Sequence, residues 1–252
     1  MKIKRLIKVL LLVNVMVIMM LSSCKKEDEA TQDDENNSSQ DKGEFTDSRD
    51  NKTYHWVKIG SQIWMAENLS YTGSDIQHVV PNTDWENNSG YDAWCYYEND
   101  AKYDKEYGVL YQWKAAKIAC PDGWHLPTDK EWTQLEDYLK KNGYSYDGIT
   151  GNPGIAKSLA SDNGWSTSIY QGAVGNSDFT SFRNKTGFSA LPGGFRNFNG
   201  AFNDISEIGY WWSSTIDNSM DAYGRYIDYD DSEVSSYSNK KLNGFSVRCI
   251  KD

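Results

Sequence analysis

Histidine, proline and cysteine are scarce in this chain of 252 residues, which contains three, five and four of them, respectively. The histidines, His55, His78 and His125, stand far apart and lack the paired spacing of a zinc site. The sequence therefore predicts no metal and no cofactor.

Positive charge is also in short supply. The chain has 26 lysines and arginines against 36 aspartates and glutamates, which gives a formal net charge of −10 at pH 7. A protein that binds nucleic acid needs a basic face for the phosphates. We therefore expect no nucleic acid among its partners.

Catalytic motifs are missing as well. The sequence has no glycine-rich phosphate loop, no Gly-x-Ser-x-Gly turn and no closely paired cysteines. Asp and Glu are plentiful, but no pattern places two of them across a cleft. The sequence thus predicts a protein that is not an enzyme.

Aromatic residues, in contrast, are abundant. The chain has 10 Trp and 17 Tyr, and Phe, Trp and Tyr together make up 14% of it. Such rings fill cores or form flat platforms for ligands. For most of them the expected role is packing.

The first 24 residues have a basic start, an apolar run over 10–21 and the ending Leu21-Ser22-Ser23-Cys24. This pattern resembles a bacterial lipoprotein signal, in which residues 1–23 are removed and Cys24 is lipidated. An uncleaved membrane anchor is the alternative, which the short apolar run disfavours. We expect membrane attachment through a lipid on Cys24.

Residues 24–43 are polar and acidic, with no aliphatic side chain larger than alanine. They cannot bury enough apolar surface to offset the entropy of ordering, so we expect a solvated tether. Its Lys-rich and then acidic start resembles the surface-export signal of Bacteroidetes-type lipoproteins. The expected location is the outer membrane, facing outward, with a periplasmic orientation as the alternative.

The stretch 110–139 predicts two short helices joined by a corner. Apolar residues recur at helical spacing up to Cys120, where Cys120-Pro121 ends the first helix. The second helix begins at Thr128, three residues before Glu131 as in a capping box, and ends at Asn142-Gly143.

Strand patterns surround these helices. Residues 54–60 and 62–66 predict a hairpin that turns at Gly60-Ser61. Long loops are expected at 79–97 and 144–178, the second with a helical turn around Ile155 and Leu159. Further strands are expected at 188–192, 209–215, 222–228, 233–237 and 244–250. The prediction is a single α+β domain at 44–252, with two short helices packed on small antiparallel sheets and long loops.

The predicted order of elements resembles the first half of a C-type-lectin-like domain. It consists of a helix that ends at a cysteine, a turn, a short His-Leu-Pro-Thr strand and a second helix. More specifically, the chain resembles the Fibrobacter succinogenes major paralogous domain family. The matching segments follow in order over about residues 45–250. They are Val57-Lys58-Ile59-Gly60, Trp64-Met65-Ala66-Glu67-Asn68-Leu69, Tyr107-Gly108, Cys120-Pro121, Gly123-Trp124, Leu126-Pro127, Leu191-Pro192-Gly193-Gly194 with Arg196, and Trp211-Trp212-Ser213-Ser214.

The resemblance implies a disulfide between Cys120 and Cys249, which would join the first helix to the closing strand. An exported protein meets an oxidising compartment, where such a bridge persists. Two buried thiols are the alternative. Cys95 then remains as a free, partly buried cysteine.

The lectin-like resemblance also implies that the variable surface lies on loops beside the second half of the sheet, where binding residues often gather. The candidate ligand-binding residues there are Arg196, Asn197, Trp211, Trp212, Asp217 and Tyr223. Adjacent residues of a strand point to opposite faces, so we expect one of Trp211 and Trp212 in the core and the other as a platform. Packing of both, within the shared Trp-Trp-Ser-Ser motif, is the alternative.

Four carboxylates, Asp228, Asp230, Asp231 and Glu233, offer oxygen ligands for calcium. They fall at a predicted strand end and turn, where a solvated acidic turn is the expected role. The Glu-Pro-Asn or Gln-Pro-Asp and Trp-Asn-Asp signatures of calcium-dependent sugar binding are missing.

The resulting hypothesis is a cell-surface lipoprotein that serves as a non-catalytic binding or adhesion module for a glycan, a polymer or a protein. One alternative is a structural envelope component that assembles with partner proteins. The other is an enzyme on the related formylglycine-generating scaffold, although Cys95, Cys120 and Cys249 do not supply that enzyme's neighbouring active-site cysteines.

Overall fold

The computed structural model describes residues 41–87 and 92–252. Contacts divide the chain into the units Met1–Ser39 and Gln40–Asp252, and the fold below is that of the second unit. The predicted signal at 1–23, Cys24 and the tether up to residue 40 lie outside the described residues. No helix of the described part has the length and apolarity that crossing a bilayer requires.

The two central helices form where the sequence predicts them. α4 (Trp113–Ala119) ends at Cys120, and α5 (Asp129–Lys141) follows the short strand β7 (Trp124–His125). The predicted capping box is present: the Thr128 hydroxyl accepts from the Glu131 N–H at 3.2 Å, and the Glu131 carboxylate accepts from the Thr128 N–H at 2.7 Å. Gly143 then takes a left-handed φ of 69°, which ends α5.

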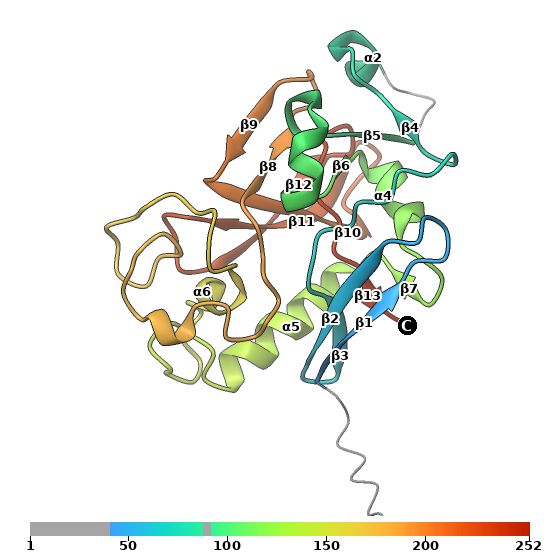
Figure 1. The fold of residues 1–252 in the computed structure, drawn as a ribbon. Helices are drawn as coiled ribbons and strands as arrows, with labels where there is room; N and C mark the ends of the chain where they lie inside the picture. Colours follow the sequence, from blue (N-terminus) through green and yellow to red (C-terminus); the bar gives the residue numbers. More distant parts are fainter. Residues whose placement is uncertain (1–40, 88–91) are drawn as a thin grey trace, which may run out of the picture. The chain divides into compact units, whose positions relative to one another are not determined.

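The first sheet contains both ends of the described chain. Its order is β1-β2-β3-β13-β7, with antiparallel pairing throughout. The predicted hairpin is confirmed as β2 (Thr53–Ile59) and β3 (Gln62–Met65). β1 (Lys42–Thr46) flanks β2, and β13 (Ile250–Lys251) lies between β3 and β7 (Figure 1).

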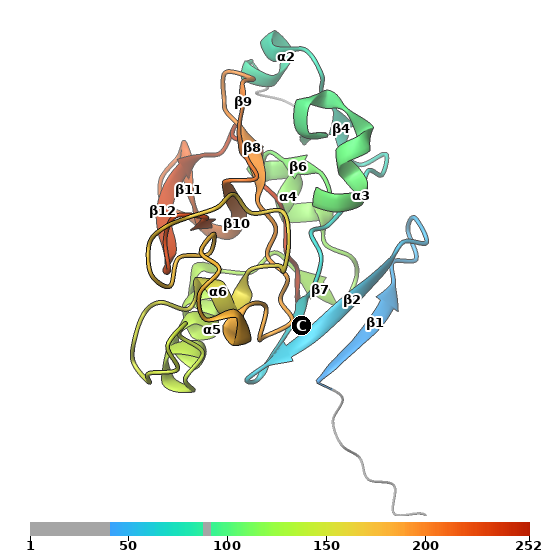
Figure 2. The same cartoon turned by 60° about the vertical axis from the view of Figure 1, so that its left-hand side comes forward.

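The second sheet has the order β12-β11-β10-β8-β9. β10 (Ile208–Ile216), β11 (Asp221–Asp228) and β12 (Val234–Lys240) form the antiparallel strands that the sequence predicts, with β12 at the outer edge (Figure 2). β8 (Gly193–Arg196) pairs parallel with β10, and β9 (Phe202–Ile205) was not predicted. α5 packs on this sheet, where the buried Arg225 of β11 binds Asp129 at 2.5 Å and Glu136 at 2.6 Å.

Two predicted strands are wrong. In 188–192 only Ala190 makes an isolated bridge, to Ala160, because Ser189 has a left-handed φ of 54° and Pro192 has no N–H to donate. The strand therefore starts at Gly193. Residues 244–246 bridge in turn to Arg196, Tyr111 and Trp211, so this segment runs between the sheets and only its end at Ile250–Lys251 is a strand.

The two regions predicted as long loops contain short elements. Within 79–97 the chain forms α2 (Asn82–Glu86), β5 (Ala93–Cys95) and a turn at η1 (Tyr97–Asn99), and β5 pairs with β4 (Gln77–His78) and β6 (Leu110–Tyr111) in a third sheet. η2 (Ala101–Tyr103) and α3 (Asp104–Tyr107) follow. The predicted helical turn is α6 (Ala156–Leu159), and η3 (Thr180–Phe182) comes after it. The fold is thus mixed α/β, built mostly of small sheets with a few short helices.

The fully buried Arg248 joins the sheets at the centre of the unit. Its guanidinium donates to Asn68 Oδ1 at 3.1 Å, to the Met65 carbonyl at 3.1 Å, to the Ser189 carbonyl at 2.9 Å and to the Phe188 carbonyl. Asn68 Oδ1 also accepts from the Trp211 indole at 2.9 Å. Segments from both halves of the chain thereby share one polar network.

The disulfide implied by the family resemblance is present. Cys120 and Cys249 are bridged, with their Cα atoms 5.9 Å apart and a sequence separation of 129. Cys95 is free, as expected, but it is fully rather than partly buried. The bridge fastens the end of α4 to the segment that carries Arg248.

Removal of this bridge by Cys120→Ser with Cys249→Ser should lower the free energy of unfolding by roughly 4 to 5 kcal/mol, because the open chain gains loop entropy. Urea unfolding under oxidising conditions measures the loss. Reductant should weaken the parent chain and leave the double variant unchanged. Equal sensitivity of both proteins to reductant would contradict this account.

His125 joins the C-terminal residue to the start of α5. Its Nδ1 lies 2.6 Å from Asp252 Oδ1 and its Nε2 lies 2.9 Å from Glu131 Oε1. Burial by itself lowers the pKa of His125, but the hydrogen bonds with Asp252 and Glu131 outweigh it, so the pKa is raised above 6.5. The charged form is therefore favoured in the folded protein.

A raised pKa in the folded state predicts that this contribution is complete below pH 6.5 and is lost as pH rises through the raised pKa. His125→Gln should flatten the decline in unfolding free energy above pH 6.5, by less than about 1 kcal/mol because the site is partly exposed. Unfolding curves at several pH values measure it. His78→Gln is the control, because burial and then the charge of Arg196 lower the pKa of His78. If the unfolding free energy of His125→Gln declined above pH 6.5 as steeply as that of the parent chain, the assignment of this decline to His125 would be refuted.

Candidate ligand-binding surface

Three of the six predicted binding residues are buried and hold the fold together. Arg196 is fully buried beneath the ring of Trp85 and donates to the carbonyls of Val79 and Val80, both at 2.7 Å. It anchors the segment before α2 to β8. The prediction that Arg196 contacts a ligand from a surface loop is therefore wrong.

The expectation of one exposed tryptophan is also wrong. Trp211 and Trp212 do point to opposite faces of β10, but both faces are covered, and the two residues are 1% and 0% exposed. Trp211 donates to Asn68, while the Trp212 indole donates to the Tyr111 carbonyl at 2.7 Å. Packing within the Trp-Trp-Ser-Ser motif is the observed role of both.

The other three predicted residues lie nearer the surface. Asp217 is exposed at the end of the β10–β11 hairpin, and its carboxylate accepts from the Tyr223 hydroxyl at 3.0 Å and the Ser238 hydroxyl at 2.8 Å. Hydrogen bonds from Ser238 and then Tyr223 lower the pKa of Asp217. Asn197 is half-buried, and its Oδ1 accepts from the Phe198 N–H at 2.7 Å. The structure brings Asp217 and Tyr223 together, but these contacts occupy the polar atoms that a ligand would need.

The acidic turn after β11 uses its carboxylates to hold the turn. Asp228 accepts from the Asp230 N–H at 2.9 Å, and Asp230 accepts from the Ser168 hydroxyl at 2.6 Å. Burial raises the pKa of Asp228, and the charges of Asp230 and Asp231 add to the increase. In residues 41–87 and 92–252, no group of three or more His, Cys, Asp or Glu is arranged to hold a metal ion.

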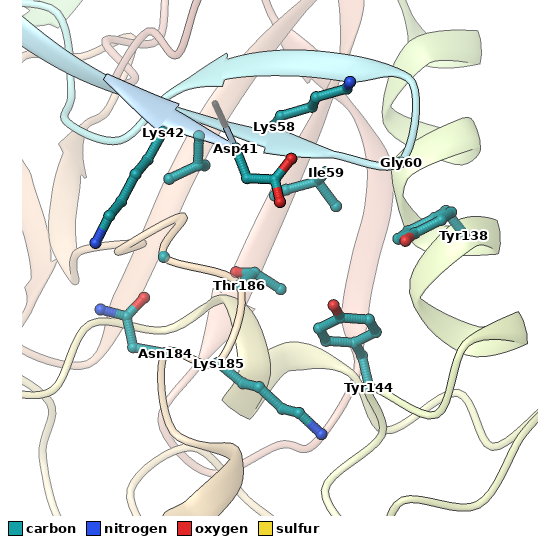
Figure 3. A pocket seen from close by; sticks show the side chains of 12 residues that line it. Asp41, Lys42, Lys58, Ile59, Gly60, Tyr138, Tyr144, Asn184, Lys185 and Thr186 are labelled. Atoms are coloured by element: carbon teal, nitrogen blue, oxygen red, sulfur yellow. The ribbon is translucent and has the colours of Figure 1, made fainter. Parts of the chain in front are cut away.

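A groove that the sequence did not reveal lies between the first sheet and the loops beside α5 (Figure 3). It has a volume of about 690 Å³. The walls come from the start of β1, the β2–β3 turn, the last turn of α5 and the loop 184–187. Its lining residues are Asp41, Lys42, Val57, Lys58, Ile59, Gly60, Tyr138, Tyr144, Asn184, Lys185, Thr186 and Gly187.

Two glycines allow the walls to approach each other. Gly60 has a φ of 62°, and a Cβ there would lie 2.8 Å from the ring of Tyr138. Gly187 has a φ of 71°, and a Cβ there would lie 3.0 Å from Val57. Both positions combine a left-handed backbone with close contact, so only glycine fits without movement of a neighbour.

Two half-buried tyrosines form one side of the groove. The ring centroids of Tyr138 and Tyr144 are 6.2 Å apart, with 38° between the ring planes. Lys185 Nζ lies 5.3 Å from the centroid of Tyr144. Burial raises the pKa of Tyr144, and Tyr138 and Asp41 contribute further, so the Tyr144 hydroxyl stays protonated at neutral pH.

The amide and hydroxyl groups of the opposite loop are already used. Asn184 Oδ1 accepts from the Ser189 N–H at 3.0 Å, and the Thr186 hydroxyl donates to the Ser158 carbonyl at 2.8 Å. The groups left to meet a ligand are the two tyrosine rings, their hydroxyls and the charged side chains.

Two smaller hollows share lining residues with the groove. One, of about 480 Å³, lies on the other side of Tyr138 and includes Lys130 and Lys141. The other, of about 530 Å³, shares Lys42 and Gly187 with the groove and reaches Trp56. An extended ligand could therefore follow the surface past the two tyrosines in either direction.

No local motif marks this groove, because its residues come from four segments between positions 41 and 187. The nearest signal is Tyr138, which the helical pattern assigns to the apolar face of α5 together with Trp132, Leu135 and Leu139. Those three are buried whereas Tyr138 is only half-buried, at the rim of that face.

These features define a mixed α/β domain that is closed by a disulfide and presents a shallow groove beside its first sheet. The chain belongs to the Fibrobacter succinogenes major domain family, whose model matches residues 57–251. The family predicted from the sequence motifs is thus confirmed. Neither the search of curated proteins nor that of solved structures finds a match.

Proposed function

We propose that this protein is a non-catalytic binding or adhesion module that is attached to the bacterial cell surface and recognises a glycan. The observation that carries the proposal is the groove, in which Tyr138 and Tyr144 present their rings side by side on a scaffold fixed by α5. Aromatic rings stack on the apolar faces of sugars, and nearby polar groups meet the hydroxyls. A groove with adjoining hollows suits a ligand made of several linked sugars.

A C-type-lectin-like arrangement of the domain belongs to this proposal. Three features support it: α4 ending at Cys120, the β7–α5 unit that follows, and the bridge to Cys249 near the chain end. The binding mode differs from calcium-dependent sugar recognition, because its sequence signatures are missing. The groove lies beside the first sheet rather than at the loops of the second.

Membrane attachment is the second part of the proposal and is supported by the sequence of the first 43 residues. The lipobox-like Leu21-Ser22-Ser23-Cys24 and the Lys-rich, then acidic stretch after it are typical of an exported outer-membrane lipoprotein that faces outward. A lipid on Cys24 would leave the domain on a polar tether. Such a position suits an adhesion module.

Incorporation of a fatty-acid analogue should label the protein in growing cells, and Cys24→Ala should abolish the label, because Cys24 is the proposed acceptor. Protease treatment of intact cells should remove the domain if it faces outward. The control is a periplasmic protein, which must survive the same treatment. Labelling of Cys24→Ala, or protection from protease in intact cells, would contradict the anchor or the orientation, respectively.

A glycan array probed with an unlipidated chain from residue 25 onward should show saturable binding to a subset of glycans. Tyr138→Ala and Tyr144→Ala should each weaken it by roughly 10-fold, because each removes a ring worth about 1 to 2 kcal/mol of contact. The matched control is Tyr170→Ala, because Tyr170 is 58% exposed and does not line the groove. No saturable binding to any glycan, or equal losses in all three variants, would refute the proposal.

A further inference from the structure

The groove gathers positive charge in a protein that is acidic as a whole. Lys42 from β1, Lys58 from β2 and Lys185 from the loop 184–187 line it, and Asp41 is the one carboxylate among its lining residues. The chain carries a formal net charge of −10 at pH 7. The lining of the groove is therefore opposite in sign to the protein around it.

Within residues 41–87 and 92–252, these three lysines have no carboxylate partner. Six lysines elsewhere, for example Lys102 and Lys157, have a carboxylate oxygen within 4.0 Å. Among the described residues, Lys42, Lys58 and Lys185 make no such pair, although a majority of the charged groups in the chain are acidic. Their ammonium groups are therefore available to an anionic ligand, with Asp41 as the one carboxylate among the lining residues.

The arrangement of the side chains selects the kind of anion. Figure 3 shows the rings of Tyr138 and Tyr144 along one side, with Lys58 above them and Lys185 below. Rings take the apolar face of a sugar, while ammonium groups at the edge bind substituents that project from it. No arginine lines the groove, so its lining residues lack the planar, bidentate contact by which a guanidinium binds phosphate and nucleic acid.

We infer that the groove binds an anionic polysaccharide, whose pyranose rings stack on Tyr138 and Tyr144 while its carboxylate or sulfate groups pair with Lys42, Lys58 and Lys185. This inference rests on the proposed function and names its ligand class. The adjoining hollow adds Lys130, and Lys141 at 4.0 Å from Asp137, so the positive lining extends along the path of a chain. Uronic acids and sulfate esters share the required chemistry.

The test uses the mature chain purified from membranes in detergent, and it measures affinity by calorimetry for two matched pairs of polymers. Polygalacturonate is compared with its methyl ester, and dextran sulfate with dextran. Each anionic polymer should bind at least about 10-fold more tightly than its neutral counterpart, since several surface ion pairs act together. The preferred pair then separates carboxylate from sulfate recognition.

Salt and substitutions identify the groove as the source. The affinity should fall about 10-fold between about 50 mM and about 300 mM sodium chloride, because salt screens exposed pairs. Lys58→Gln and Lys185→Gln should each weaken binding by about 5-fold. Lys117→Gln is the matched control, because Lys117 is exposed, lacks a carboxylate partner and lies 4.9 Å from the Trp113 ring, outside the groove.

The outcomes are separable. Equal affinity for the charged and neutral polymers, with no effect of Lys58→Gln, would leave the glycan-binding function intact and overturn this inference. No binding of any of the four polymers would overturn this inference, and it is the glycan array that decides whether the proposed function falls with it. A loss in Lys117→Gln equal to that in Lys58→Gln, or tighter binding of a single-stranded oligonucleotide of the same charge, would show unspecific attraction of anions and would also overturn it.

Discussion

The buried guanidinium of Arg248 is the interaction on which the rest of the structure depends. It lies in the interior without a carboxylate among its hydrogen-bond partners, and carbonyl and amide oxygens satisfy it instead. A buried charge is tolerated only when such acceptors are held in place. The β3 end, the 188–189 segment and the closing segment must therefore meet at one point, and the Cys120–Cys249 bridge restricts the last of these next to Arg248.

This network also determines one wall of the groove. The carbonyls of Phe188 and Ser189 turn towards Arg248, and Ser189 adopts a left-handed φ of 54° to do so. The loop before them is then fixed by Asn184, whose Oδ1 accepts from the Ser189 N–H. The position of the loop that carries Lys185 is thus a consequence of hydrogen bonding in the core.

Local sequence signals predicted the elements that local physics forms. The Thr128 capping box, the end of α4 at Cys120 and the β2–β3 turn each depend on residues within a few positions, and all three are confirmed. The prediction was wrong where residues far away in the sequence determine the local structure. Residues 188–192 have the composition of a strand, yet the carbonyls of Phe188 and Ser189 accept hydrogen bonds from Arg248. Trp211 and Trp212 point to opposite faces of β10 as expected, yet both faces are covered. Burial on both sides is a property of the assembled sheets.

Prediction from sequence has the same limit for charge, because the net charge does not reveal the positive lining of the groove. Net charge is a sum over the whole chain, and it correctly describes long-range attraction or repulsion. A ligand a few ångströms from the surface responds instead to the nearest groups, because salt screens charges beyond about 8 to 10 Å. Lys42, Lys58 and Lys185 stand at separate positions in the sequence, and only the fold brings them to one groove. Under the proposed function, an acidic protein holds a groove with a positive lining, and selectivity for a polymer comes from the nearest lysines and the tyrosine rings rather than from the net charge.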